Sequence, residues 1–353
     1  MKNQDKYIIS DKITILDALK QIDELSKIAY SPLCLFVIDQ EGKVQGSLTD
    51  GDIRRAILKG VTLEDNIKSA LNKTYNFIKI NSFDFNYIKM LKEREISLVP
   101  MIDEDGKIVK LIDIKNHKSI LPLDAVIMAG GLGTRLRPFT ENIPKPLLKL
   151  GDKTLIEYNI DWLNEFGIMN FYITVNYLGD QIIEHLGDGK TKEIKINYVK
   201  EDKPMGTAGS ISLINNFENE DILVLNSDII TNIDYHDFYQ SFLEEEAMMT
   251  IASIHYTRNV PYAVFETDCR KILSYKEKPS YNYTSNAGIY LVKKELLKEI
   301  PENTFFNMID LIDICLKKDY KITCHPILGY WLDVGNMEDL AKAQCDIKNI
   351  RFS

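Results

Sequence analysis

The 353-residue sequence carries 43 basic and 52 acidic residues, a formal net charge of −9, which argues against general nucleic-acid binding because such proteins use basic faces. No apolar run approaches the roughly 18 to 20 residues of a membrane span, and the polar start MKNQDKYIIS lacks a signal-peptide core, so we expect no membrane partner and a cytoplasmic location. Five scattered cysteines and five dispersed histidines predict neither a disulfide framework nor a zinc site. The length is sufficient for two domains.

The first 120 residues contain an internal repeat. The segment 37–44, VIDQEGKV, recurs as MIDEDGKI at 101–108, and each copy predicts two short strands joined by a glycine-containing hairpin turn. A helical pattern precedes each copy: it is clear at Ile15, Leu19, Ile22 and Leu25 and weaker at Tyr87, Ile88 and Leu91. Because one such unit could hardly bury its apolar face alone, we expect the two copies to pair.

This layout resembles a tandem pair of cystathionine-β-synthase (CBS) modules, an α+β pair that often binds adenine nucleotides. The resemblance implies that Thr49 and Asp50 read the ribose of a bound nucleotide, since a carboxylate accepts from both ribose hydroxyls. The second copy offers Ile112-Asp113 without the hydroxyl, so at most one site is complete. Alternatively, Thr49 and Asp50 only cap a helix that starts near Ile53, with Asp52 in its first turn. The module pair then has a purely structural or dimerising role.

A polar stretch at 115–123 precedes the second half, so we predict domains at residues 1–120 and 121–353. From Asp124 onward, predicted strands at 171–175, 195–199 and 222–225 are separated by helical patterns such as 155–166. This alternation is typical of a doubly wound, mainly parallel, Rossmann-like α/β sheet. Ligands of such sheets bind at the carboxyl ends of the strands.

A glycine-rich loop follows the first of these strands. The apolar run 125–128 predicts a buried strand, and the loop AGGLGTRLRP at 129–138 begins where it ends. Glycines allow close backbone approach and turn N–H groups toward phosphate oxygens, and Arg135 and Lys145 add two cations. A Walker A loop and a dinucleotide fingerprint are both excluded by spacing, so the pattern favours another kind of nucleotide polyphosphate site.

The string AGGLGTRLRPFTENIPKPLL resembles the signature of the sugar-1-phosphate nucleotidyltransferases. The resemblance implies a nucleotide site at Ala129, Gly130, Gly131, Gly133, Thr134, Glu201, Gly206 and Thr207. It implies catalytic roles for Arg135, Lys145, Asp228, Lys278 and Asp333, and sugar contacts from Glu277 and Asn286. Asp228 and Asp333 match the family's metal-binding positions, and their oxygens suit Mg²⁺.

The chemistry that such a site requires is simple. A sugar phosphate oxygen, already an anion, attacks the α-phosphorus of a nucleoside triphosphate, and pyrophosphate leaves, so no general base is needed. Guanine presents two adjacent N–H donors that one carboxylate can accept, whereas uracil and thymine suit an amide. Glu201 therefore favours GTP, with UTP or dTTP as the alternative.

CBS modules ahead of this domain resemble the glucosamine-1-phosphate guanylyltransferases of bacterial nonulosonic (legionaminic) acid biosynthesis. This resemblance implies GTP and a hexose-1-phosphate, first glucosamine-1-phosphate and then mannose-1-phosphate, as substrates. A non-enzyme alternative is a catalytically silent subunit that senses nucleotides through Thr49 and Asp50. Paired modules of this kind commonly associate, so we expect a homo-oligomer.

Overall fold

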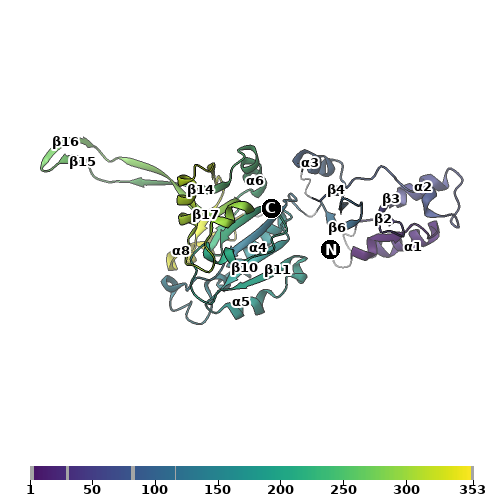
Figure 1. The fold of residues 1–353 in the computed structure, drawn as a ribbon, viewed down its shortest axis with the longest axis horizontal. Helices are drawn as coiled ribbons and strands as arrows, with labels where there is room; N and C mark the ends of the chain where they lie inside the picture. The colour runs from purple at the N-terminus through teal and green to yellow at the C-terminus, as the bar shows by residue number, and fades with distance from the viewer. Residues whose placement is uncertain (1–3, 29–31, 81–83, 116, 351–353) are drawn as a thin grey trace. The chain divides into compact units, whose positions relative to one another are not determined.

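The computed structural model describes residues 4–28, 32–80, 84–115 and 117–350. The chain divides into two compact units (Figure 1). The first comprises residues 1–122 with 165–167, and the second comprises residues 123–164 with 168–353. Each unit has its own sheets and its own apolar core.

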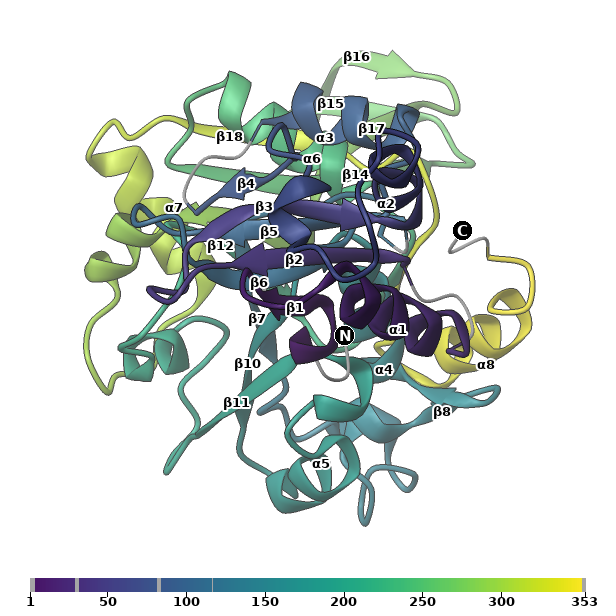
Figure 2. The same ribbon diagram turned by 90° about the vertical axis from the view of Figure 1, so that its right-hand side faces the viewer.

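Two three-stranded sheets of the same design form the first unit (Figure 2). The strands of the first sheet, in spatial order, are β1 (Ile8–Ser10), β2 (Cys34–Ile38) and β3 (Val44–Thr49). Those of the second are β4 (Ile78–Lys79), β5 (Leu98–Ile102) and β6 (Ile108–Asp113). In both, the first strand runs parallel to the second, and the second forms a bulged hairpin with the third. The repeat in the sequence is therefore a repeat in the structure.

The two copies pack against each other, as the sequence predicts. Leu98 and Leu111 of the second copy are buried in the same cluster as Leu35 and Leu48 of the first. The N–H of Val44 also donates to the carbonyl of Gly106 at 3.0 Å, so the two hairpin turns are joined. Burial of apolar surface between the copies supplies the core that one copy lacks.

Three helices accompany these sheets: α1 (Ile15–Ser26), α2 (Asp50–Ile57) and α3 (Phe85–Glu93). Helix α1 follows the predicted apolar spacing and buries Ile15, Ile22 and Leu25. The predicted start of α2 near Ile53 is wrong, because the helix begins at Asp50. Its first turn is polar and therefore carries no apolar periodicity that could have marked the start.

A seven-stranded sheet forms the centre of the second unit, and the α/β class with a mainly parallel sheet is confirmed. In spatial order its strands are β11 (Lys195–Lys200), β10 (Asn170–Val175), β7 (Leu123–Met128), β12 (Asp221–Asn226), β17 (Ser280–Lys293), β14 (Met249–Asn259) and β18 (Ile322–Pro326). Strands β11, β10, β7 and β12 are parallel, β17 runs antiparallel to its neighbours, and β14 and β18 are parallel to each other.

Both faces of this sheet are buried. Val126, Val224 and Val292 share a cluster with Met308 and Leu311 of helix α7 (Met308–Lys317), and the alternate residues of β7 and β12 are also fully buried. The other helices are α4 (Leu155–Glu165), α5 (Gly179–Leu186), α6 (Tyr235–Glu244) and α8 (Met337–Asp346). The near-continuous apolar strands follow from burial on both sides.

Three short strand pairs complete the second unit. They are β8 (Lys149–Leu150) with β9 (Lys153–Thr154), β13 (Ile229–Thr231) with β19 (Trp331–Asp333), and β15 (Val264–Asp268) with β16 (Lys271–Lys276). The β13–β19 pair matters most for the site because it lies beside two of the predicted carboxylates.

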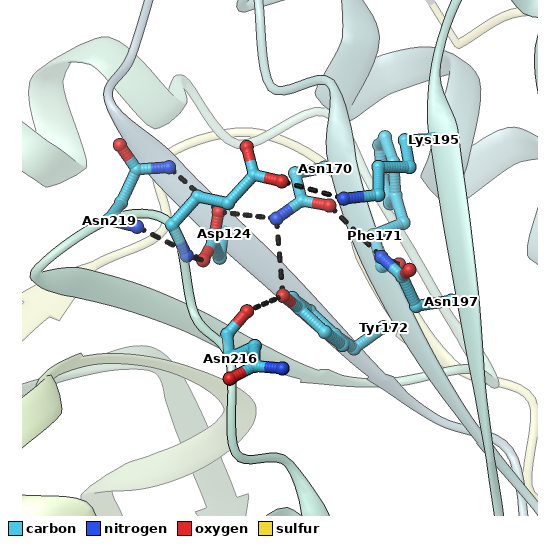
Figure 3. A network of polar contacts seen from close by, with 9 residues as sticks. Asp124, Asn170, Phe171, Tyr172, Lys195, Asn197, Asn216 and Asn219 are labelled. Atoms are coloured by element: carbon cyan, nitrogen blue, oxygen red, sulfur yellow. Dashed lines mark hydrogen bonds and ion pairs between the residues drawn. The ribbon is translucent and has the colours of Figure 1, made fainter. Parts of the chain in front are cut away.

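A polar network ties together the amino ends of β7, β10 and β11, opposite the glycine loop (Figure 3). The fully buried carboxylate of Asp124 accepts from Nδ2 of Asn170 at 2.9 Å, from the N–H of Glu218 at 2.6 Å and from Nδ2 of Asn219 at 2.7 Å. Asn197 donates to Oδ1 of Asn170 at 3.1 Å. This network stabilises the sheet at the end away from the predicted ligand.

Among the described residues, no helix is both long and apolar enough to span a bilayer.

Candidate functional site

The glycine loop leaves the carboxyl end of β7, where parallel strands place ligands. The N–H of Ala129 still belongs to the sheet and donates to the carbonyl of Thr174 at 3.0 Å. Gly130 follows, and around Gly131 a Cβ would meet nothing within 4 Å. Gly131 is thus the open point of the loop, where a ligand can approach the backbone.

Gly133 turns the loop toward Lys145. Its φ of +60° is left-handed, a conformation that glycine adopts without steric cost. A Cβ there would come within 3.1 Å of Thr140 and 3.2 Å of Lys145, and the Thr140 hydroxyl donates to the Gly133 carbonyl at 2.8 Å. Thr134 then opens a short 3₁₀ turn, Thr134–Leu136. Sequence reasoning did not identify Thr140, which closes the loop.

Glu201 lies over the loop at Gly130. It directly follows β11, and its N–H donates to the carbonyl of Val175 at 2.9 Å. A Cβ on Gly130 would come within 2.8 Å of Glu201 Oε1, so only glycine leaves room for the carboxylate. Burial raises the pKa of Glu201, while hydrogen-bond donors around the carboxylate act in the opposite direction.

Asp228 and Asp333 meet through the pairing of β13 with β19. Asp228 directly precedes β13, Asp333 ends β19, and the register places Ile229 opposite Asp333. The N–H of Val334 donates to the Asp228 carbonyl at 3.0 Å. Two carboxylates 105 positions apart in the chain therefore share one edge of the unit.

Two cations accompany this acidic pair. Lys145, which is 9% exposed, forms an ion pair with Asp228. The Arg135 guanidinium lies beside the turn after Asp333, since a Cβ on Gly335 would be 3.3 Å from its Nη1. Burial and then the Asp228 charge raise the pKa of Asp333, and Lys145 and Arg135 oppose that shift. Four of the five predicted catalytic residues thus converge.

The acidic pair fits a hard divalent cation. Oδ1 of Asp333 is buried and accepts no hydrogen bond from any described residue. Mg²⁺ is commonly bound by one or two carboxylates together with substrate phosphates. No group of three or more His, Cys, Asp or Glu side chains in the described part of the chain could hold a metal, so phosphate oxygens would have to complete its coordination.

Gly206 and Thr207 have structural partners in the loop before α7. Gly206 has a φ of +78°, and a Cβ there would come within 2.6 Å of the Phe306 carbonyl. The Thr207 hydroxyl accepts from the N–H of Met308 at 3.0 Å, and its own N–H donates to Asn307 at 3.2 Å. Their predicted nucleotide contacts remain a prediction.

The predicted sugar-binding residues do not lie together. The Asn286 amide donates to the Tyr290 hydroxyl at 2.8 Å, and the carbonyl of neighbouring Ala287 accepts from Trp331 of β19 at 2.9 Å. Asn286 is therefore close to the strand that carries Asp333. Glu277 and Lys278 instead lie in the segment between β16 and β17, and both are exposed. Their predicted contacts with the sugar phosphate and the sugar therefore remain a prediction.

In the first unit, a cavity of about 330 Å³ lies between the two copies. Thr49 and Asp52 line it, together with residues of the second copy such as Ser97. Asp50 is not among the lining residues and forms an ion pair with Arg54. Asp52 rather than Asp50 therefore lines the cavity, and the predicted contact of Asp50 with a ribose remains a prediction.

Capping of α2 explains why Asp52 rather than Asp50 lines the cavity. The Thr49 hydroxyl donates to Asp52 Oδ2 at 2.6 Å, and the Asp52 carboxylate also accepts from the Thr49 N–H at 2.9 Å. This is a capping box, which turns the residue three positions after the N-cap back toward it. The Thr-x-x-Asp spacing of residues 49–52 was the signal that could have identified Asp52.

Comparison with known proteins agrees with this architecture. The nucleotidyl transferase family model matches residues 124–350, and the CBS domain model matches residues 3–59. The second unit is similar to the crystal structure of HddC from Yersinia pseudotuberculosis, with a TM-score of 0.51 and 27% identity over 64% of this chain and 99% of that one.

Two curated relatives are mannose-1-phosphate guanylyltransferases. That of Dictyostelium discoideum, a catalytic subunit beta, is 32% identical over 226 residues, and a probable enzyme of Oryza sativa is 30% identical over 232 residues. Each alignment spans 62% of this chain and 62% of the relative's own length. Because the family model covers most of the chain and the fold agrees, the chain belongs to the nucleotidyl transferase family and carries a CBS domain ahead of its transferase unit.

Proposed function

We propose that this protein transfers GMP from GTP to a hexose-1-phosphate and releases pyrophosphate. The observation that carries the proposal is the position of the Glu201 carboxylate over Gly130, at the loop that leaves the carboxyl end of β7. A carboxylate can accept both adjacent N–H donors of guanine, N1–H and N2–H. The names of the two guanylyltransferase relatives point to the same base.

The reaction requires alignment more than acid–base chemistry. An anionic phosphate oxygen of the hexose-1-phosphate forms a bond to the α-phosphorus, and the bond from that phosphorus to the pyrophosphate oxygen breaks. Lys145 pairs with Asp228, and Arg135 lies beside the turn after Asp333. We assign both cations to the phosphates that gain charge. When bound by Asp228 and Asp333, Mg²⁺ would supply Lewis-acid stabilisation of the phosphate oxygens.

Two hexoses are candidates for the acceptor. The combination of CBS modules with this transferase unit favours glucosamine-1-phosphate, whereas the relatives are named for mannose-1-phosphate. The test is pyrophosphate release with Mg²⁺, crossing GTP, UTP, dTTP, CTP and ATP against the 1-phosphates of glucosamine, mannose, glucose and N-acetylglucosamine.

Turnover confined to GTP supports the base assignment, and the best acceptor then identifies the sugar. Turnover with UTP or dTTP would overturn the role of Glu201 but keep the reaction class. A preparation that binds nucleotide and turns over no pair would indicate a catalytically silent sensing subunit. Asp228→Asn serves as the inactive control because it removes one of the two carboxylate charges.

The cavity of the first unit supports a second candidate function, binding of an adenine nucleotide. Its lining combines a hydroxyl and a carboxylate at the start of α2 with Arg55 and Tyr75, groups suited to a ribose, a phosphate and a base. Titration calorimetry with AMP and ATP tests binding. GTP affinity measured with and without saturating AMP tests coupling, which must be reciprocal.

A further inference from the structure

The arm formed by residues 254–285 projects from the sheet of the second unit (Figure 1). It consists of the outer parts of β14 and β17, which pair from Ile254 with Ser285 to Asn259 with Ser280, and of the β15–β16 hairpin. Pairing of β14 with β18 ends at Ser253, and pairing of β17 with β12 ends at Ile289. In the described structure the arm therefore has unpaired strand edges on both sides.

No residue of the arm is buried, yet it carries large apolar side chains. Tyr262 is 74% exposed, Tyr275 68% and Phe265 56%. Phe265 and Tyr275 are directly opposite in the register and share one face. An isolated two-stranded ribbon is marginally stable in water, and natural proteins cover exposed apolar edges. The arm thus has the character of a surface that is covered in the functional state.

The same arm carries Lys278, the residue that we assign to the hexose-1-phosphate. Ser280 and Asn286 lie six positions apart in β17, about 20 Å at the usual rise of a strand, and Lys278 lies two positions before Ser280. That separation is much longer than a lysine side chain. In this conformation of the arm, Lys278 lies out of reach of the edge where Asn286 and Asp333 of its own chain lie.

Charge favours a second copy of this chain as the partner of the arm. The arm carries five basic and three acidic side chains, whereas the whole chain carries 43 basic and 52 acidic residues. A basic arm on an acidic chain is complementary to the body of another copy. In a two-fold dimer each arm reaches the other protomer, so both sites are completed by the same contact.

We propose that the arm of one protomer enters the transferase site of a second copy, so that Lys278 of each chain binds the sugar phosphate in its partner. The inference rests on the proposed function, because it assigns Lys278 to the hexose-1-phosphate. Glu277 directly precedes Lys278 and therefore reaches the same site of the partner, where its carboxylate accepts from sugar hydroxyls. The active unit is then a dimer with two shared sites.

Intersubunit complementation tests this arrangement. A Lys278→Ala chain and an Asp228→Asn chain are co-expressed with different affinity tags. The hetero-oligomer is then purified through both tags in succession. In the hetero-oligomer, the Lys278→Ala protomer keeps Asp228 and receives an intact Lys278 from its partner. We expect about half the pyrophosphate release of doubly tagged wild type, with at least a hundredfold less in either variant alone.

Several results would overturn the proposal. If Lys278 acted within its own chain, every site of the hetero-oligomer would carry one lesion and activity would stay at the level of the single variants. Failure of two differently tagged wild-type chains to copurify would exclude a shared site. Lys276→Ala is the matched control, two positions away and also exposed, and a Lys278→Ala enzyme as active as this control would exclude Lys278 from the site.

A measurement of the oligomeric state tests the arm interface independently of the proposed function. The double variant Phe265→Lys, Tyr275→Lys changes only exposed side chains, so the fold should keep its melting temperature. We expect light scattering to show a dimer for wild type and a monomer for this variant. Inactive wild type that is still dimerised through the arm would refute the proposed function alone, whereas an unchanged dimer in the variant would refute the arm interface.

Discussion

The Glu201 carboxylate occupies the space that a side chain on Gly130 would need, with 2.8 Å between its Oε1 and the position of a Cβ on Gly130. The loop backbone and the carboxylate are therefore fitted to each other, although they are 71 positions apart in the chain. Under the proposed function, the base and the phosphates of one nucleotide bind at this place. The first prediction concerns that carboxylate.

Glu201→Gln should lower the preference for GTP over UTP by about 10- to 100-fold, because it replaces a charge-assisted acceptor of two guanine N–H donors by an amide. The measurement is the ratio of kcat/KM for the two nucleotides. Asp202→Asn, an exposed neighbour, should leave the ratio unchanged. A ratio that is the same in wild type and Glu201→Gln contradicts the assignment.

Asp333→Asn should stabilise the metal-free protein at neutral pH. The raised pKa of Asp333 means that its charged form disfavours the folded state, and that the penalty disappears as pH falls through the raised pKa. The gain in Tm should therefore be largest near pH 8 and shrink in acid. Mg²⁺ should raise the Tm of wild type and not of Asp333→Asn.

The control for this prediction is Glu338→Gln, an exposed residue in the first turn of α8. Its Tm should follow wild type at each pH, with and without Mg²⁺. Equal Mg²⁺ stabilisation of wild type and Asp333→Asn would remove Asp333 from the metal site. A Tm gain that grows in acid would contradict the pKa argument.

Lys145→Ala should reduce kcat by about 10²- to 10³-fold, because it removes a cation held at the acidic pair where charge develops on the phosphates. It also leaves the Asp228 carboxylate without its ion-pair partner. Pyrophosphate release measures the loss. Lys149→Ala, four positions later and exposed, should retain wild-type kcat, and loss of less than tenfold in Lys145→Ala would refute its role.

Asp124→Ala should lower the free energy of unfolding by about 3 kcal/mol, because several buried donors lose their acceptor together. Urea denaturation of the variant and of Asp152→Ala, an exposed control, measures the difference. Since the network lies at the amino ends of the strands and the loop follows the carboxyl end of β7, the kcat of folded Asp124→Ala should remain near wild type. A large loss of kcat with unchanged stability would reverse this assignment.

Asp52→Asn should weaken AMP binding by tenfold or more, whereas Asp50→Asn should change it by less than twofold. Asp52 lines the cavity, and Asp50 pairs with Arg54 instead. Titration calorimetry measures both, and an unchanged Tm shows that α2 remains capped. The reverse order of effects would restore Asp50 as the ribose-binding residue.

The sequence determined the local elements where a physical pattern marks them. Apolar runs buried on both faces identified β7, β10 and β12, and helical spacing identified α1 and α4. The start of α2 was misplaced because polar first turns carry no periodicity. The glycine loop with Arg135 and Lys145 could also be recognised from the sequence. Glycine adopts the left-handed φ found at Gly133 without steric cost, and cations bind a polyphosphate.

Only the tertiary structure decided which distant residues meet. Asp228 and Asp333 come together because β13 pairs with β19, and Glu201 reaches Gly130 because β11, β10 and β7 are neighbours in one sheet. Strand pairing of this kind depends on hydrogen bonds between segments far apart in the chain, which no local pattern specifies. For the same reason, the sequence does not show where Lys278 lies relative to Asp333. A motif identifies the residue, but the direction of the projecting arm determines which site that residue can reach.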